Sequence, residues 1–387
     1  MTLSPARRAL LVAVTTNLAG VLPLFLTGAM SVQIGRELGL DPSGIGWLLA
    51  GFAVMSLLLS APLGARVGTI GISPSMRIAS GLSVVSLLAC AAAPNRLLLA
   101  AAVLVGGTSN ALGQTASNAL VAARVRAARY GLAYAIKQSA IPLSILLGGL
   151  AVPAIALTVG WRHAYLVAAA VALAALLAVP RHVAPSFGRA ERPVSSDERG
   201  SVWLLGAGLV AAVVAATSIG AHAASSAVAI GFSEGSAGLM VAAGGAAGLA
   251  VRLAAGVRAD RVSGGALTAA AVLCVMGAVG WLLMSTLWPL LFVVGLLAAN
   301  AFGWGWPGLV HLAVARRFPE ATAAASGITQ TGVALGLLIG PPVIGLVAVS
   351  AGWAWAWVLA AGSALVGAAL IALARRQLIK GRRTPVP

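Results

Sequence analysis

The sequence is short of charge, and of acids above all. Only 9% of its 387 residues are charged, with eight Asp or Glu against 25 Lys or Arg, while 60% are hydrophobic. A soluble globular protein is about 25% charged, so too few polar side chains remain here to cover a water-facing surface. This lack excludes an ordinary soluble domain and predicts an all-α integral membrane protein in a lipid bilayer.

Cysteines and clustered metal ligands are also scarce. Cys90 and Cys274 both lie in apolar stretches, with no metal-ligand spacing and no neighbouring histidine cluster. The sequence therefore predicts no disulfide framework, no bound metal and no cofactor. It has no Gly-x-x-x-x-Gly-Lys-Ser/Thr loop and no group of ionisable residues gathered at one membrane face. An ATP-driven pump within this chain and an enzyme are accordingly disfavoured.

Long hydrophobic runs, by contrast, are abundant. A window of about 19 residues separates twelve of them, each long enough to cross a hydrocarbon core of about 30 Å. The runs are 9–34, 43–63, 76–93, 97–122, 131–157, 163–180, 202–228, 236–256, 265–284, 288–314, 325–349 and 353–374. They predict twelve transmembrane helices.

The positive charge follows the loops rather than one face. Apart from Lys137 and Arg252 inside spans, nearly all basic residues fall in alternate loops, and the opposite loops hold only Arg36, Arg96 and Arg162. By the positive-inside rule, both termini are predicted to be cytoplasmic, in the inner (cytoplasmic) membrane. The formal net charge of +17 therefore does not indicate nucleic-acid binding. We expect a monomer.

The second half of the sequence repeats landmarks of the first. Pairs that coincide at a shift of 192 residues are Gly64 with Gly256, Ala123-Arg124 with Ala315-Arg316, Gln138 with Gln330, Gly148 with Gly340, and Trp161 with Trp353. Small residues at Ala140, Ser144 and Gly148 likewise meet Gly332, Gly336 and Gly340, a spacing that allows close helix approach in lipid. One offset in one orientation predicts a parallel repeat, with the solute site between the halves.

The longest polar stretch divides the spans six and six. It predicts an N-terminal six-helix bundle at 1–180, a cytoplasmic linker at 181–200, and a C-terminal six-helix bundle with a cytoplasmic tail at 201–387.

The turn after the eighth span, Gly256-Val257-Arg258-Ala259-Asp260-Arg261-Val262-Ser263-Gly264, resembles a signature of the major facilitator superfamily. The first-half copy, Gly64-Ala65-Arg66-Val67-Gly68, has a glycine in place of the acid, which puts a charged gate in that half in doubt. Two stretches together look like the branch that contains cyanate and nitroimidazole permease-like proteins. They are Asn300-Ala301-Phe302-Gly303-Trp304-Gly305-Trp306-Pro307-Gly308 and Gly327-Ile328-Thr329-Gln330-Thr331-Gly332. The resemblance implies two pseudo-symmetric six-helix bundles whose helices 1, 4, 7 and 10 line a cavity.

No acid falls in the middle of a span. The eight are Glu37, Asp41, Glu191, Asp197, Glu198, Glu234, Asp260 and Glu320. A carboxylate in the core is the natural counter-charge of a cationic solute, so a cation held by an ion pair is disfavoured. Lys137 is the converse case, a cation about 9 Å of helix rise past Gly131. We expect it to attract an anionic or strongly polarised solute; the alternative is a side chain that snorkels to the cytoplasmic interface.

Polar residues on several spans complete the candidate site. On the fourth span Asn110, Gln114, Ser117 and Asn118 share a stripe, which predicts either a wet cavity or interhelical hydrogen bonds. The candidate substrate-binding residues are Lys137, Gln114, Asn118, Asn110, Gln138, Trp304, Asn300, Gln330, Asn17 and His222. His222 and His311 are candidates for proton coupling. For all of these, ordinary packing is the alternative.

Residues at the cytoplasmic helix ends are expected to act in gating or in structure. They are Asp260, Arg261, Arg252, Gly256 and Gly64. An acid in such a place can hold a neighbouring helix N-terminus or a basic residue and so stabilise one of two gate states.

These observations predict a secondary active or facilitative transporter that moves a small solute, anionic or compact and polar, by alternating access, with or without a coupled proton. One alternative is a drug or natural-product exporter with an apolar, aromatic pocket. An alternative of another class is a non-transporting membrane sensor with the same fold.

Overall fold

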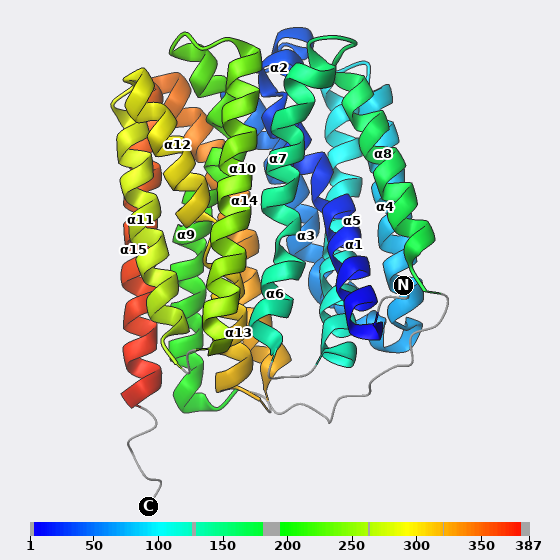
Figure 1. Cartoon of the computed structure of the whole chain (residues 1–387), viewed down its shortest axis with the longest axis vertical. Coiled ribbons are helices and arrows are strands. Elements are labelled where there is room, and N and C mark those ends of the chain that lie inside the picture. The colour runs from blue at the N-terminus through cyan, green and yellow to red at the C-terminus, as the bar shows by residue number, and fades with distance from the viewer. Residues whose placement is uncertain (1–3, 126–128, 181–193, 262–263, 320, 381–387) are drawn as a thin grey trace, which may run out of the picture.

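The computed structural model describes residues 4–125, 129–180, 194–261, 264–319 and 321–380, and it is built from helices packed side by side (Figure 1). Within these residues, twelve segments are long and apolar enough to cross a membrane, which confirms the predicted multi-pass, all-α class. We call the end at which α1 begins and α15 ends the inner end, since the sequence predicts it to be cytoplasmic.

The first half holds six spans. Its elements are α1 (Pro5–Ala29), α2 (Ser31–Leu38), α3 (Pro42–Ile70), α4 (Ile72–Ala92), α5 (Arg96–Arg124), α6 (Tyr130–Gln138), α7 (Ala140–Ala151), the π-helical turn η2 (Val152–Ala156) and α8 (Trp161–Ala178). Short polar side chains set some of the starts: the Asp41 carboxylate accepts a hydrogen bond from the Gly44 amide at 2.7 Å, and Asn95 caps α5 in the same way.

The second half holds six more. Its elements are α9 (Ser196–Ala229), α10 (Glu234–Arg261), α11 (Ala266–Ser285), α12 (Pro289–Gly303), α13 (Pro307–Arg317), α14 (Thr322–Ala351) and α15 (Trp353–Lys380). Residues 181–193 of the predicted linker lie outside the described residues, and α9 already begins within its last few positions.

Two predicted spans are broken helices. The run 131–157 is interrupted at Ser139, between α6 and α7, and closes in η2. The run 288–314 is interrupted between α12 and α13. Proline explains both breaks, because Pro142 has no N–H for the Gln138 carbonyl four residues earlier, and Pro307 has none for the Gly303 carbonyl. The second break falls where Gly303, Gly305, Pro307 and Gly308 weaken the backbone hydrogen bonds of a helix. The first corrects the prediction of one continuous span at 131–157.

The halves meet about a pseudo-twofold axis. Helices α1 and α9 cross where a Cβ on Gly28 would lie 2.1 Å from the Gly220 carbonyl oxygen, and these glycines are 192 residues apart. The small-residue ridges also pack as equivalents, α7 against α1 and α14 against α9. Gly148 lies against Phe25, and Gly336 against Val210 and Val213. The parallel repeat thus brings α6, α7 and α10 together on one side of the axis and α3 and α14 on the other.

Candidate functional site

The candidate site centres on Lys137, in the last turn of α6. Its side chain is fully buried, and its Nζ donates to Gln114 Oε1 at 2.5 Å and to Asn118 Oδ1 at 2.8 Å. The two amides lie one turn apart on α5, so that both point to the same place. Lys137 therefore does not snorkel to the membrane surface; it lies between α5 and α6 with two neutral acceptors.

The rest of the α5 stripe is tied to neighbouring helices. Ser117 Oγ donates to Asn17 Oδ1 on α1 at 3.1 Å. Asn110 Nδ2 donates to Ser56 Oγ on α3 at 3.2 Å. Gln114 and Asn118 remain half-exposed although they hold Lys137. Ser117 and Asn110 therefore bind neighbouring helices together, as one of the two alternatives predicts, while the partners of Lys137 stay partly exposed.

At the end of α6, next to Lys137, Gln138 approaches the second half of the protein. Its Nε2 lies 3.4 Å from His311 Nε2 on α13. The Tyr134 ring lies edge-on to His311, with ring centroids 6.0 Å apart. His311 thus shares the neighbourhood of Lys137, at the contact between the halves. Tyr134 was missed by the sequence analysis, although its position three residues before Lys137 placed it on the same side of α6.

Arg252 is the second buried cation of this region. Its side chain is 1% exposed. Its Nε donates to the Trp304 carbonyl at 3.0 Å, Nη2 donates to the same carbonyl, and Nη1 donates to the Gln138 carbonyl. These two carbonyls are the ones left free at the two helix breaks. Arg252 therefore joins α10 to both broken helices instead of snorkelling.

Neither cation has a carboxylate partner among the described residues. The nearest acid along α10, Asp260, is used elsewhere: its two oxygens accept the backbone amides of Gly131 and Leu132, both at 2.9 Å. Asp260 thus holds the N-terminus of α6, where the helix dipole favours a negative charge. Gly256 allows this approach, because its added Cβ would lie 2.4 Å from that of Ala135.

Several predicted site residues lie elsewhere. His222 Nε2 lies 2.7 Å from the Pro341 carbonyl oxygen, and its ring is 5.9 Å from that of Trp353, so it faces α14 and α15. Asn300 donates to Leu296 of its own helix at 3.0 Å and is buried. The structure does not bring either residue to Lys137.

Four more candidates make no polar contact with Lys137. Trp304 is 5% exposed and packs edge-on to Phe25, with ring centroids 6.4 Å apart. Gln330 is half-buried on α14 and has no hydrogen bond among the described residues. Arg261 is exposed and Gly64 contacts Thr115 within its own half.

The part of the chain that the structure describes contains no cluster of metal-binding side chains. No group of three or more His, Cys, Asp or Glu side chains is placed to hold an ion there.

Comparison with known proteins gives two findings. A family model described as Major Facilitator Superfamily matches residues 9–309 and 204–387. The crystal structure of the human organic anion transporter MFSD10 (TETRAN) superposes with a TM-score of 0.74 at 19% sequence identity, covering 95% of this chain and 100% of that one. At this identity the likeness shows a shared fold. No curated protein matches the chain in sequence.

Proposed function

The chain belongs to the major facilitator superfamily, whose proteins are transporters, and from that premise we propose that it carries a small anionic solute. One observation supports the anion above all others: a fully buried lysine ammonium held by two amide oxygens. Amide oxygens solvate a cation without neutralising it, and an unneutralised charge in a membrane core is unfavourable. An anion from outside would supply the missing charge.

The neighbourhood favours the same ligand. Arg252 adds a second buried cation near Lys137, and its partners are also neutral. Gln114 and Asn118 can exchange their bond with Lys137 for bonds from their amide N–H groups to an anion, because side-chain amides carry donors as well as acceptors. The likeness to an organic anion transporter adds nothing to this argument, since it extends to the fold alone.

We further propose that transport proceeds by rocking of the two bundles, 1–180 and 201–387, around this site, with both termini in the cytoplasm and the chain in the inner membrane as a monomer. The outer end is closed by contacts between the halves: Arg36 and Gln33 both bind Glu234. Proton coupling, if the carrier uses it, falls to His311, since His222 faces away from Lys137.

Within the family, the 300–308 stretch supports placement with the cyanate and nitroimidazole permease-like branch. The exporter alternative depends on aromatic side chains that face the solute. Trp304 and Trp306 are 5% and 1% exposed, which makes an aromatic drug pocket at this place the weaker proposal.

The test is flux in proteoliposomes with nitrate, acetate and benzoate as anions, uracil as a neutral heterocycle, and choline as a cation. We expect anion flux, and a loss of about 10- to 100-fold in apparent affinity for Lys137→Ala, because a charge-assisted hydrogen bond contributes about 1.5–3 kcal/mol. Lys137→Arg should retain part of the flux, since it keeps the charge.

Thr329→Ala is the matched control, because Thr329 is the buried residue 192 positions after Lys137 in the second half. It should transport like the wild type. Transport of choline alone, or normal anion transport by Lys137→Ala, would show that the anion proposal is wrong. Tight anion binding by purified protein without flux would favour the sensor alternative.

A further inference from the structure

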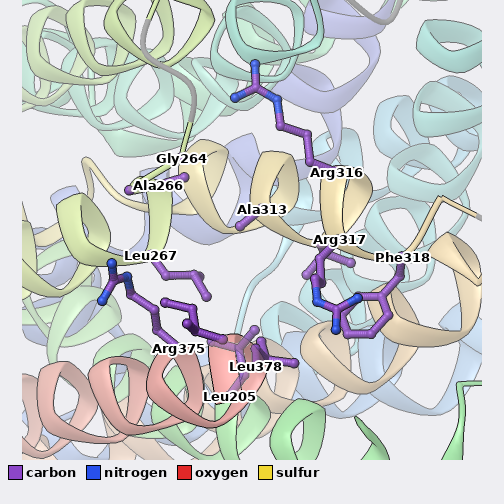
Figure 2. Close-up of a pocket in the computed structure, with 13 residues that line it drawn as sticks. Leu205, Gly264, Ala266, Leu267, Ala313, Arg316, Arg317, Phe318, Arg375 and Leu378 are labelled. Carbon is purple, nitrogen blue, oxygen red and sulfur yellow. The ribbon is translucent and has the colours of Figure 1, made fainter. Parts of the chain in front are cut away.

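A pocket separate from the Lys137 site lies at the inner end of the second half (Figure 2). It has a volume of about 390 Å³ and opens where α9 and α11 begin and where α13 and α15 end. Three arginines line it, Arg316, Arg317 and Arg375, and no described acid does. The remaining lining is mostly apolar, with Leu205, Leu267 and Leu378 among its residues.

The three arginines differ in the polar partners that their guanidinium groups already have. Arg316 donates to the Ala259 carbonyl at 3.2 Å, and Figure 2 shows it pointing away from the leucines. Arg317 is paired with Glu198. Arg375 has no polar partner among the described residues and lies beside Leu267 and Leu378. The pocket thus combines one guanidinium without a polar partner among the described residues, that of Arg375, with one that is paired with Glu198, and its lining is otherwise mostly apolar.

We propose that this pocket binds the headgroup of one anionic phospholipid, with the phosphate on Arg375 and Arg317 and the first part of an acyl chain along the leucines. The chemistry of the pocket selects an amphiphile, since the arginines match a phosphate and the leucines match hydrocarbon. Its depth fits as well, because the pocket lies at the ends of four membrane-spanning segments, at the level of the headgroups. Juxtamembrane arginines attract anionic lipids there.

A lipid so placed would join α13 to α11 and α15, two helices that already pack against each other. Arg317 ends α13, Arg375 lies in the last turns of α15, and Leu267 begins α11. Helix α13 follows a break and carries His311, so a bound headgroup would brace the inner part of that span against α11 and α15. Anionic lipid is therefore expected to stabilise the protein beyond the general effect of a bilayer.

The test uses the full chain, purified in an uncharged detergent and titrated with dioctanoyl phosphatidylglycerol, with binding read by calorimetry and stabilisation by thermal unfolding. We expect saturable binding of one lipid by the wild type and binding at least about fivefold weaker for Arg375→Gln, since one juxtamembrane arginine contributes about 1 kcal/mol. Arg376→Gln is the matched control: Arg376 is the next residue on α15 but is exposed and does not line the pocket. It should bind like the wild type.

Three further arms identify the ligand. Glycerol phosphate, which lacks the chains, and dioctanoyl phosphatidylcholine, which lacks the net charge, should both bind much more weakly. Ala313→Phe, which fills the pocket without changing its charge, should weaken phosphatidylglycerol binding in a folded protein. The proposal is overturned if Arg375→Gln and Arg376→Gln behave alike, if phosphatidylcholine binds equally well, or if glycerol phosphate binds as tightly, which would indicate a site for free phosphate instead.

Discussion

The two halves meet along two contact surfaces that the repeat makes equivalent, yet the surfaces differ at their inner ends. We call the contact of α6 and α7 with α10 the first seam, and that of α3 with α14 the second. At the outer end they match: a Cβ on Gly238 would meet Gly149, and a Cβ on Gly46 would meet Pro341, with each residue 192 positions from its counterpart. The two seams therefore have equivalent close backbone contacts at their outer ends.

At the inner end the match is lost. On the first seam, Gly256 contacts Ala135. The equivalent pair on the second seam is Gly64 and Gly327, and there a Cβ on Gly327 would meet no described atom within 4 Å. The first seam is closed at its inner end and the second is not.

The side chains explain the difference. Lys137, Arg252 and Asp260 lie on the first seam, and their counterparts on the second are Thr329, Ser60 and Gly68. At the inner end, the charges of Arg252 and Asp260, which contact α6 from α10, thus both lie on the first seam. The two seams thus share their packing at the outer end and differ at the inner end, where only the first has charged side chains at these positions.

Among mutations that test the difference between the two seams, the largest effect is expected at Arg252. Arg252→Met leaves the Gln138 and Trp304 carbonyls without donors, at a cost of about 1–3 kcal/mol for each buried group. We expect the free energy of unfolding to fall by about 2–5 kcal/mol, measured as a lower thermal midpoint or denaturant midpoint. The free energy of unfolding of Arg252→Lys should lie between those of the wild type and Arg252→Met, because one ammonium cannot reproduce the several N–H donors of the guanidinium.

Ser60→Ala is the matched control for Arg252, as the equivalent position on the second seam. Its hydroxyl bonds only to Ser56 of its own helix, so a change well under 1 kcal/mol is expected. Equal stability of Arg252→Met and Ser60→Ala would mean that Arg252 does not fasten the first seam.

A smaller effect is expected at Asp260. Asp260→Asn weakens two charge-assisted bonds to the amides of Gly131 and Leu132. Hydrogen–deuterium exchange in the peptide that contains these amides should become about fivefold faster, which corresponds to about 1 kcal/mol of lost protection. Arg261→Gln, which changes the exposed neighbour, should leave the exchange as in the wild type. Unchanged exchange in Asp260→Asn would mean that the Asp260 carboxylate does not hold the N-terminus of α6.

The sequence predicted the fold better than the site. Twelve apolar runs and one constant offset sufficed for the spans and the repeat, because lipid leaves few alternatives to long helices. The break at Ser139 was missed, since Pro142 lies within a continuous apolar run and hydropathy does not register a lost N–H.

The site was harder to predict, because the rotation of each helix about its own axis decides which side chains face the site. A stripe on α5 predicted that Gln114 and Asn118 share a face, and that face turned out to meet Lys137. His222 also lay on a cavity-lining span of the resembled fold, but packing turns it toward Pro341 and Trp353. Which face of an apolar helix points inward depends on its neighbours, and in an almost uniformly apolar chain the sequence carries little of that information.

The smallest expected effect extends the comparison to the outer end, where Glu37 makes a contact inside the first half that the equivalent positions of the second half lack. Glu37 accepts hydrogen bonds from Arg162 Nη1 at 2.5 Å and Trp161 Nε1 at 2.6 Å, whereas the counterparts of Glu37 and Arg162 are Ala229 and Ala354. The bond from Arg162, followed by that from Trp161, lowers the pKa of Glu37 below its ordinary value of 4.5. The carboxylate therefore stabilises the folded state fully above pH 4.5, and this contribution is lost as pH falls through the lower folded pKa.

Glu37→Gln should accordingly lower the thermal midpoint by about 1–3 °C at pH 7, a small change because both partners are partly exposed and solvent screens the pair. The gap between wild type and variant should stay constant down to about pH 5 and narrow toward pH 3. Thermal unfolding curves recorded from pH 7 to pH 3 measure this gap in thermal midpoint. Glu198→Gln, which changes an acid at the inner end, is compared under the same conditions. A gap that persists at pH 3 would mean that hydrogen-bond geometry, rather than the charge of Glu37, stabilises the outer end of the first half.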